Sequence, residues 1–319
     1  MMKEIGGYIE LDRVNGAMLH EGARALNCGR NALAYLIEAK NIKAIALPYY
    51  LCTSVREVCE AYGLRIRYYH IRKNFETELP GLYEDEWLYF VNYYGQLDEE
   101  RLRAVKARFG RVIIDNAQAY FAPPCDGIDT IYTCRKFFGV ADGAFLFTDA
   151  QLKREIPTDI SYDRMEFLLG RYEGRASDFY RGYAANNSRF SGMEIRRMSA
   201  LTENLLRRID YDEVKKKRTR NFEVLSEHFM RDNELTLRVP EGAFAYPLML
   251  PEAKKLRQTL ISEKIYIPLL WPNVADDAGA DSTDAHLAEQ ILPIPCDQRY
   301  DEEVMSYICG RIDALRREV

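Results

Sequence analysis

The chain has 319 residues, 47% of them hydrophobic, which is enough to bury a large core and to form two lobes. Its 44 basic and 49 acidic side chains give a net charge of -5 without a basic block, which argues against nucleic acid as a partner. No apolar run reaches the length of a membrane span and no signal-peptide core is visible, so no membrane partner is expected. The seven cysteines form no CxxC pair and the four histidines are scattered, which predicts reduced thiols, a cytoplasmic location and no metal site.

The first half of the chain alternates predicted strands with predicted helices. Residues 1–20 are expected to form an N-terminal arm, and the helix that follows starts at Gly29. Next come expected strands at 44–47, 64–71, 87–93 and 112–115, with helices at 55–61, capped by Ser54, and 99–109, capped by Asp98. These near-continuous apolar strands, separated by helices, predict a mostly parallel sheet covered on both faces. Two further strands over 129–148 have no helix between them, so antiparallel pairing is expected there.

The second half of the chain has a different pattern. Residues 150–232 are predicted to be largely helical, with a break rich in Gly, Asn and Ser at 184–192. A smaller α/β unit follows, with strands expected at 235–239, 245–250 and 265–267, helices at 252–263 and 301–317, and a solvated, mobile loop at 275–284. We therefore expect a large domain over residues 1–205 and a small C-terminal domain over residues 206–319.

Two of the expected strands end beside residues that carry chemistry. The apolar run at 112–114 ends on Asp115, and the run at 129–133 leads into Lys136, which a glycine-bearing turn follows. Open α/β sheets place their ligands at such strand ends. An acid and a lysine there fit a pyridoxal 5'-phosphate (PLP) site, in which the lysine forms a Schiff base and the acid keeps the pyridine nitrogen protonated. Taken singly, each residue is more commonly a surface ion pair or a solvated charge.

The start of the helix at Gly29 supplies a second, independent signal. A glycine there lets a ligand approach the backbone, and the free N–H groups and the helix dipole attract an anion such as a phosphate. Alone this signal is weak, because most helices that begin with glycine bind nothing. Its agreement with Asp115 and Lys136 favours a PLP site over structural roles for these residues.

Five short motifs occur in one order along the chain. They are Gly29-Arg30-Asn31-Ala32-Leu33, Pro48-Tyr49-Tyr50, Tyr94-Gly95-Gln96, Asp115-Asn116-Ala117-Gln118-Ala119, and Lys136 followed by Asp142-Gly143. Together they make the chain resemble the DegT-type sugar aminotransferases, which are fold-type-I PLP enzymes. The resemblance implies an α/β fold of the fold-type-I PLP transferase class, with a large, mostly parallel-sheet domain that binds PLP and a smaller C-terminal α/β domain. It also implies a homodimer with its sites at the subunit interface.

Position by position, the resemblance implies a role for each site residue. Lys136 would hold PLP and then move a proton between Cα and C4′, while Asp115 would pair with the ring nitrogen. Gln118 would lie beside the ring and its phenolic oxygen. The phosphate would be bound by the hydroxyl of Thr133 and by the backbone N–H groups at the helix start, those of Gly29, Arg30 and Asn31.

Two features depart from the family pattern. Cys52 stands where an aromatic residue commonly stacks on the cofactor ring, so that stacking could pass to Tyr49 or Tyr50. The asparagine that reaches the neighbouring subunit's phosphate is missing from its usual motif, and Asn186 or Asn187 could replace it. Such altered phosphate and stacking positions could also mark a sensor or scaffold that binds PLP or another ligand without turnover.

The function that the resemblance implies is the transfer of an amino group from an amino acid, expected to be glutamate, to a keto-sugar nucleotide through a Schiff base on Lys136. The alternative is a non-catalytic sensor or scaffold that binds PLP or another ligand on the same fold; the retained Lys136 and Asp115 argue against it. A third interpretation, a glycosyltransferase-like nucleotide-binding fold with a metal at Asp115 or Asp142, leaves Lys136 without a role.

Overall fold

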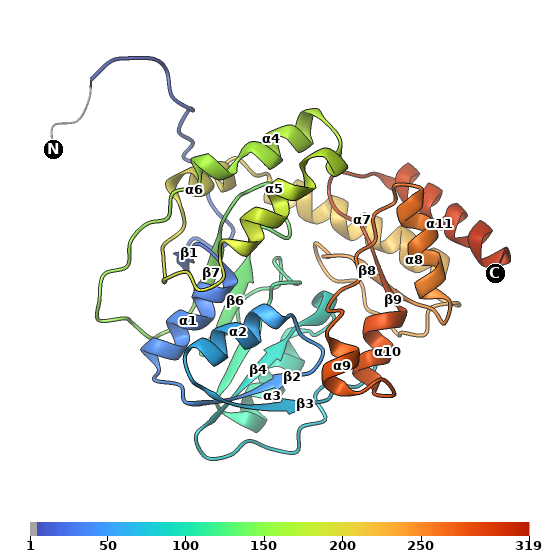
Figure 1. Cartoon of the computed structure of the whole chain (residues 1–319), viewed down its shortest axis with the longest axis horizontal. Coiled ribbons are helices and arrows are strands. Elements are labelled where there is room, and N and C mark those ends of the chain that lie inside the picture. The colour runs from blue at the N-terminus through green and yellow to red at the C-terminus, as the bar shows by residue number, and fades with distance from the viewer. Residues whose placement is uncertain (1–4, 319) are drawn as a thin grey trace.

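A seven-stranded mixed sheet forms the centre of the molecule, whose computed structural model describes residues 5–318. The strand order is β1-β7-β6-β5-β4-β2-β3 (Figure 1). Strands β2 to β6 are parallel to one another, whereas β7 runs antiparallel to both β6 and β1. The strands are β1 (Arg24–Leu26), β2 (Ala44–Pro48), β3 (Arg65–Tyr69), β4 (Glu86–Val91), β5 (Val112–Asp115), β6 (Asp129–Thr133) and β7 (Ala144–Phe147). This arrangement confirms the expected α/β class and the antiparallel pair around Lys136.

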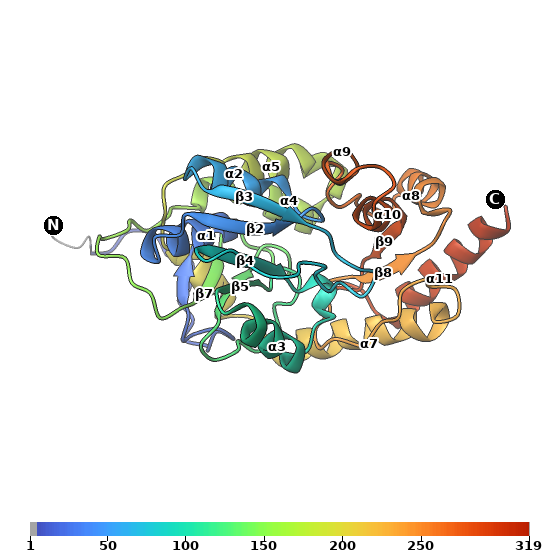
Figure 2. The ribbon, with the colours of Figure 1, turned by 90° about the horizontal axis from the view of Figure 1, so that it is seen from below.

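Helices cover both faces of this sheet. Helices α1 (Gly29–Ala39) and α2 (Thr53–Ala61) lie on one face, and α3 (Glu99–Phe109) lies on the other (Figure 2). The chain direction explains this, because the right-handed crossovers from β2 to β3 and from β4 to β5 step to opposite sides of the sheet. Asp98 caps α3 as expected, since its carboxylate accepts the backbone N–H of Arg101 at 2.9 Å.

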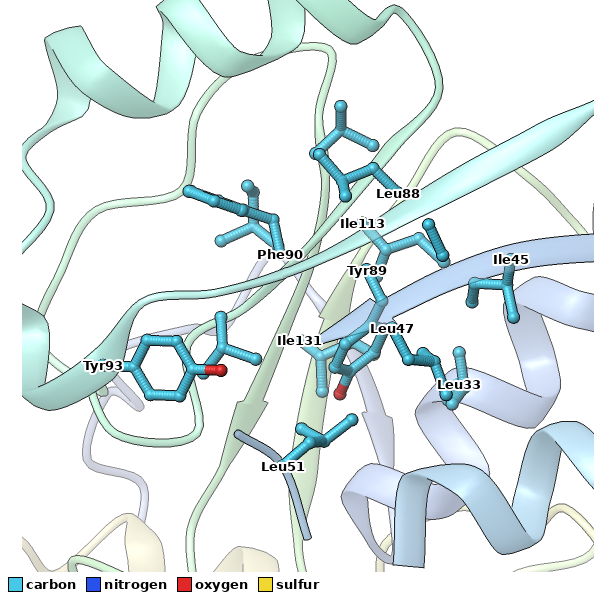
Figure 3. Packing of buried hydrophobic residues seen from close by; sticks show 14 of the residues in the cluster. Leu33, Ile45, Leu47, Leu51, Leu88, Tyr89, Phe90, Tyr93, Ile113 and Ile131 are labelled. Carbon is cyan, nitrogen blue, oxygen red and sulfur yellow. The ribbon is translucent and has the colours of Figure 1, made fainter. Parts of the chain in front are cut away.

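Aliphatic side chains fill the core between the sheet and its helices. Ile45, Leu88 and Ile113 are fully buried on three adjacent strands, and Leu33 joins their cluster from α1 (Figure 3). Strands that are covered on both faces bury almost every residue, as β2 and β5 do. Each such side chain stabilises the fold by about 1.5–3 kcal/mol. The strand ends that carry Asp115 and Thr133 are therefore anchored in a rigid core.

The rest of the chain is mostly helical. The helices that follow the sheet are α4 (Glu166–Glu173), α5 (Ala176–Ser188), α6 (Ala200–Leu206) and α7 (Tyr211–Phe229), and two short 3-10 turns lie at Tyr93–Gly95 and Tyr162–Arg164. The C-terminal unit pairs β8 (Tyr246–Met249) with β9 (Ile291–Ile294) and packs α7, α8 (Ala253–Ser262) and α11 (Glu302–Arg317) around a second apolar cluster. Helices α9 (Val274–Ala278) and α10 (Thr283–Gln290) contribute instead to the cluster of the large sheet. Among residues 5–318, no helix has both the length and the apolar character needed to cross a membrane.

Some expected elements in the C-terminal half are wrong. Residues 235–239 and 265–267 form no strand, and part of the expected loop at 275–284 is helical in α9 and α10. Strand β9 was hidden by Pro293, because proline normally argues against a strand. Both strands of a two-stranded sheet are edges, so Pro293 can pair with Pro247 there.

Smaller corrections concern helix ends and the N-terminus. Cys52, not Ser54, occupies the N-cap of α2, and it makes no side-chain capping bond. Helix α5 continues to Ser188, inside the expected break at 184–192. Strand β1 was not expected because three residues are too few to show a period. Of the expected arm over residues 1–20, residues 1–4 lie outside the described part of the chain.

Candidate active site

The start of α1 presents free backbone donors beside the end of β6. In the described structure the N–H groups of Gly29, Arg30 and Asn31 have no hydrogen-bond acceptor, and the N-cap residue Cys28 makes no side-chain bond to them. A Cβ on Gly29 would lie only 2.9 Å from Cγ2 of Thr133, so glycine is needed for this close approach. The Thr133 hydroxyl is itself buried without a hydrogen-bond partner. These donors together form a cradle that fits a phosphate.

The carboxylate of Asp115 ends β5 and is almost fully buried. Its Oδ2 accepts the hydroxyl of Tyr89 at 2.8 Å, and its Oδ1 accepts the backbone N–H of Ala117 at 2.8 Å. Burial and, second, the charge of Asp115 raise the pKa of Tyr89 well above its usual value, so Tyr89 stays a neutral donor. Each carboxylate oxygen has a further lone pair, so Asp115 can also accept a hydrogen bond from a protonated ring nitrogen.

Strand register places Asp115 and the phosphate cradle on the same face of the sheet. Asp115 is the parallel partner of Ile131, and partners in register point to the same face. Thr133 lies two residues beyond Ile131 and therefore shares that face. One strand spacing across and two residues along separate the Cα atoms of Asp115 and Thr133 by roughly 8 Å. A pyridine ring with a phosphate arm can bridge such a span.

Gln118 supplies a second buried donor without a partner near this face. Its Oε1 accepts the backbone N–H of Tyr94 at 2.9 Å, while its Nε2 is buried and has no acceptor among the described residues. Tyr94 holds a left-handed backbone conformation with φ 52°, a strained state that is typical of functional sites. A free amide donor next to Asp115 fits the expected role of Gln118 beside a phenolic oxygen.

Lys136 lies in the turn between β6 and β7 and is exposed. Its Nζ is 5.7 Å from the centre of the Phe244 ring, within the range of a cation–π contact. It lines a groove of about 930 Å³ between its own loop, helices α4 and α5, and the C-terminal unit. Asp115 does not line this groove, and no hydrogen bond or ion pair joins the two side chains. The structure thus brings Asp115, Thr133 and Gly29 to one face, whereas Lys136 lies in the groove.

The remaining candidate residues differ in whether their polar groups already have hydrogen-bond partners. The Asn31 amide donates to Asn27 Oδ1 and to Glu194 O, both at 2.7 Å, so only its backbone N–H is available. Arg30 keeps a buried Nε without a partner. Cys52 is exposed, and its sulfur accepts the Ser54 hydroxyl at 3.2 Å.

The alternative residues for stacking and for the partner's phosphate all have contacts within their own chain. Tyr49 stacks on Tyr68 with ring centres 5.0 Å apart, and Tyr50 packs edge-on against Trp271 at 4.5 Å. The Asn186 amide donates to Ala141 O at 2.8 Å, and the Asn187 oxygen accepts the guanidinium of Arg135. A ring has a second face and an amide nitrogen has a second N–H, so these contacts leave both alternative roles as predictions.

The far end of the lysine turn is anchored by Asp142, which is fully buried. Its Oδ1 accepts the Ser199 hydroxyl at 2.7 Å and also the Thr202 hydroxyl, and its Oδ2 accepts the Ser199 N–H at 2.8 Å. These bonds place the carboxylate at the start of α6, where the helix dipole favours a negative charge. Gly143 follows with φ 119°, a conformation that a side chain would strain. These three donors hold the Asp142 carboxylate in place at the far end of the lysine turn.

Sequence reasoning missed Tyr89 as a site residue. Tyr89 is two residues before Val91, the register partner of Asp115, so it points to the same face as Asp115. The available signal was a tyrosine among the apolar, buried residues at the end of β4, because a buried hydroxyl needs an acceptor.

Solved structures with the same architecture are numerous, although no family model matches the chain and no curated protein matches it. CalS13, a sugar aminotransferase from Micromonospora echinospora, superposes with a TM-score of 0.64 at 20% identity, covering 92% of this chain and 87% of its own. A DegT DnrJ EryC1 StrS aminotransferase from Brucella abortus gives a TM-score of 0.61 at 14% identity over 92% of this chain and 86% of its own. Spr1654 from Streptococcus pneumoniae, in its PMP form, gives 0.65 at 13% identity over 93% of this chain and 88% of its own. The chain therefore has the fold of the DegT-type sugar aminotransferases.

Proposed function

We propose that this protein is a PLP-dependent aminotransferase. The observation that carries the proposal is the shared face of Asp115, the Thr133 hydroxyl and the free N–H groups at Gly29. An anion cradle and a buried carboxylate at this separation fit the two ends of PLP. The fold that the chain shares with aminotransferases, one of them solved in PLP and PMP forms, supports the same cofactor.

The site residues would divide the work as follows. PLP, when bound, supplies an aldehyde that an amine can attack and a ring that accepts electrons. The α1 start and Thr133 would hold the phosphate, Asp115 would keep a proton on the ring nitrogen, and Gln118 would donate to the phenolic oxygen. Lys136 would bond to the cofactor through Nζ and, once displaced by the amino substrate, would move the proton at Cα. Tyr89 holds Asp115 in place.

We propose an amino acid, glutamate, as donor and a keto-sugar nucleotide as acceptor. The groove at Lys136 supports an anionic acceptor with a flat ring, because arginine and tyrosine side chains line it and Asp297 is the one carboxylate among its lining residues. CalS13, which shares this fold, is a sugar aminotransferase, and this supports a sugar substrate. The cytoplasmic location stays a prediction from the reduced thiols of the sequence.

We also propose a homodimer. The N-terminal arm carries exposed Ile5, Tyr8 and Ile9, each at least 89% exposed, and runs away from the body of the molecule (Figure 1). On the α4–α5 hairpin Tyr172 is 93% exposed. Large apolar side chains exposed to this degree support a role in protein contacts. Tyr172→Glu should dissociate the dimer in analytical ultracentrifugation, whereas Tyr307→Glu on α11 should not; a monomeric wild type would refute the proposal.

The division into a large domain over 1–205 and a small domain over 206–319 is likewise a proposal. The second apolar cluster, which lies wholly within residues 222–315, supports it. Helices α9 and α10 pack on the large sheet, so the two parts are expected to unfold together rather than in separate transitions.

The test of the main proposal starts from purified protein with added PLP. Bound cofactor should give a visible absorbance band that borohydride bleaches, and peptide mass analysis should find the label on Lys136. Lys136→Ala should lose the label, whereas Lys153→Ala, which removes another exposed lysine, should keep it. A wild type that takes up no PLP would overturn the proposal.

The alternative of a non-catalytic binding protein on this fold predicts the same PLP uptake but no turnover. Glutamate should convert the bound cofactor to its amine form if the protein is an aminotransferase, with loss of the visible band and release of a keto acid. A PLP-loaded protein that keeps its band in excess glutamate and in other amino acids would favour the sensor or scaffold.

A further inference from the structure

Arg218 on α7 is a buried cation that pairs with no carboxylate. Its side chain is 2% exposed, and no ion pair within residues 5–318 includes it. Burial lowers the pKa of Arg218 to about 10, an effect that nearby Asp297 partly opposes. Burying a guanidinium without a carboxylate partner costs free energy unless its N–H donors are hydrogen-bonded. The hydrogen bonds that Arg218 makes therefore indicate its structural role.

Those bonds converge on the backbone next to Lys136. Arg218 Nη2 donates to the carbonyl oxygen of Phe137 at 3.2 Å, and its guanidinium stacks 4.6 Å from the centre of the Phe137 ring. Gln298, whose Oε1 accepts Arg218 Nε at 2.6 Å, donates its own Nε2 to the same Phe137 oxygen at 2.8 Å. Two side chains of the C-terminal unit thus hold one carbonyl in the lysine turn.

The other edge of the guanidinium bonds to the segment that carries Phe244, the aromatic contact of Lys136. Arg218 Nη1 donates to Ala243 O at 2.8 Å, and the next residue is Phe244, whose ring faces Lys136 Nζ. One planar group therefore fixes both the residue after Lys136 and the residue before its aromatic contact. A lysine at position 218 would keep the charge but could not hold both carbonyls in one plane.

We propose that Arg218 and Gln298 act as a positioning pair for Lys136, which couples the C-terminal unit to the covalent step. The inference rests on the proposed function. In that step Lys136 Nζ forms a C=N bond with the aldehyde carbon of PLP and one water leaves, so Nζ has to lie within bonding reach of that carbon. Lys136 is exposed, and within residues 5–318 its amine makes no hydrogen bond or ion pair and lies over the Phe244 ring, so the turn itself must supply the orientation.

The experiment separates binding of PLP from bond formation. Arg218→Lys, Gln298→Leu, the double variant and the wild type are loaded with PLP, and the rate of labelling of Lys136 by borohydride is followed by peptide mass. Affinity without the covalent bond is measured by equilibrium dialysis in the Lys136→Ala background. Arg220→Gln is the matched control, because Arg220 lies on the same helix but pairs with exposed Glu302.

Both single variants should label Lys136 about tenfold to a hundredfold more slowly, the loss expected for a misplacement near 1 Å, while the affinity without the bond stays unchanged. The labelling rate of the double variant should fall by less than the product of the two single-variant factors, because Arg218 and Gln298 share the Phe137 oxygen. Arg220→Gln should behave as the wild type. Wild-type labelling rates in both single variants overturn the inference, as does an equal fall in affinity and labelling. If Arg218→Lys does not fold by circular dichroism, Gln298→Leu decides the question. A wild type without PLP overturns the proposed function instead, and the inference with it.

Discussion

Replacing Gly29 with alanine tests whether the start of α1 has to lie against β6 in order to bind a phosphate. The new Cβ would lie 2.9 Å from Thr133 Cγ2 and 3.9 Å from Ile131 Cγ2, so the helix start or the strand end has to move. Overpacking of this kind costs about 1–3 kcal/mol. The helical preference of alanine over glycine returns about 0.5–1 kcal/mol. The free energy of unfolding should therefore fall by no more than ~2.5 kcal/mol.

The effect on PLP binding should be larger than the effect on stability. A shifted α1 start weakens charge-assisted hydrogen bonds to the phosphate, each worth about 1.5–3 kcal/mol. Losing one of them lowers the affinity about tenfold to a hundredfold. Urea unfolding with and without PLP measures both quantities, because a ligand that binds only the native state raises the midpoint. Gly310→Ala in α11, where a Cβ meets nothing within 4 Å, should leave binding intact; wild-type PLP affinity in Gly29→Ala would refute the argument.

Two further outcomes follow from the buried groups. Asp115→Asn keeps an acceptor for Tyr89 but removes the charge proposed to pair with the ring nitrogen of PLP. The rate at which glutamate converts bound PLP to its amine form should fall at least about tenfold, because a hydrogen bond worth about 1.5–3 kcal/mol is lost. Stopped-flow absorbance measures this rate, and an unchanged rate would contradict the role of Asp115. His20 is buried with its pKa lowered from 6.5 to about 4. Between pH 6.5 and 4, His20 is therefore protonated in the unfolded chain but neutral in the native state. The free energy of unfolding should fall by up to about 3 kcal/mol as pH drops through this range. Urea titrations should show this loss reduced in His20→Gln but not in His286→Gln, which changes an exposed histidine; equal pH dependence in both variants would rule His20 out.

What could be predicted from the sequence depended on how far apart the interacting residues lie. A glycine at a helix start, an acid at a strand end and Asp98 at its N-cap are encoded within a few residues, and each has the predicted position in the structure. The bond between Tyr89 and Asp115 spans 26 residues and needs the register of β4 with β5. No local pattern specifies that register. Strands β1 and β9 were missed for local reasons instead, because β1 is too short to show a period and Pro293 lies within β9.

The two halves of the proposed site have different structural origins, and this bears on how the protein would work. Gly29, Thr133 and Asp115 are placed by the core of the large sheet, so PLP capture should depend on that core alone. The lysine turn is held from 81 residues away by Arg218, whose helix packs in the C-terminal cluster. A change in how the C-terminal unit sits on the sheet would then alter bond formation at Lys136 before it altered cofactor affinity. Substrates that filled the groove would contact both parts, including the α4–α5 hairpin, so their binding would adjust the lysine through the same contacts.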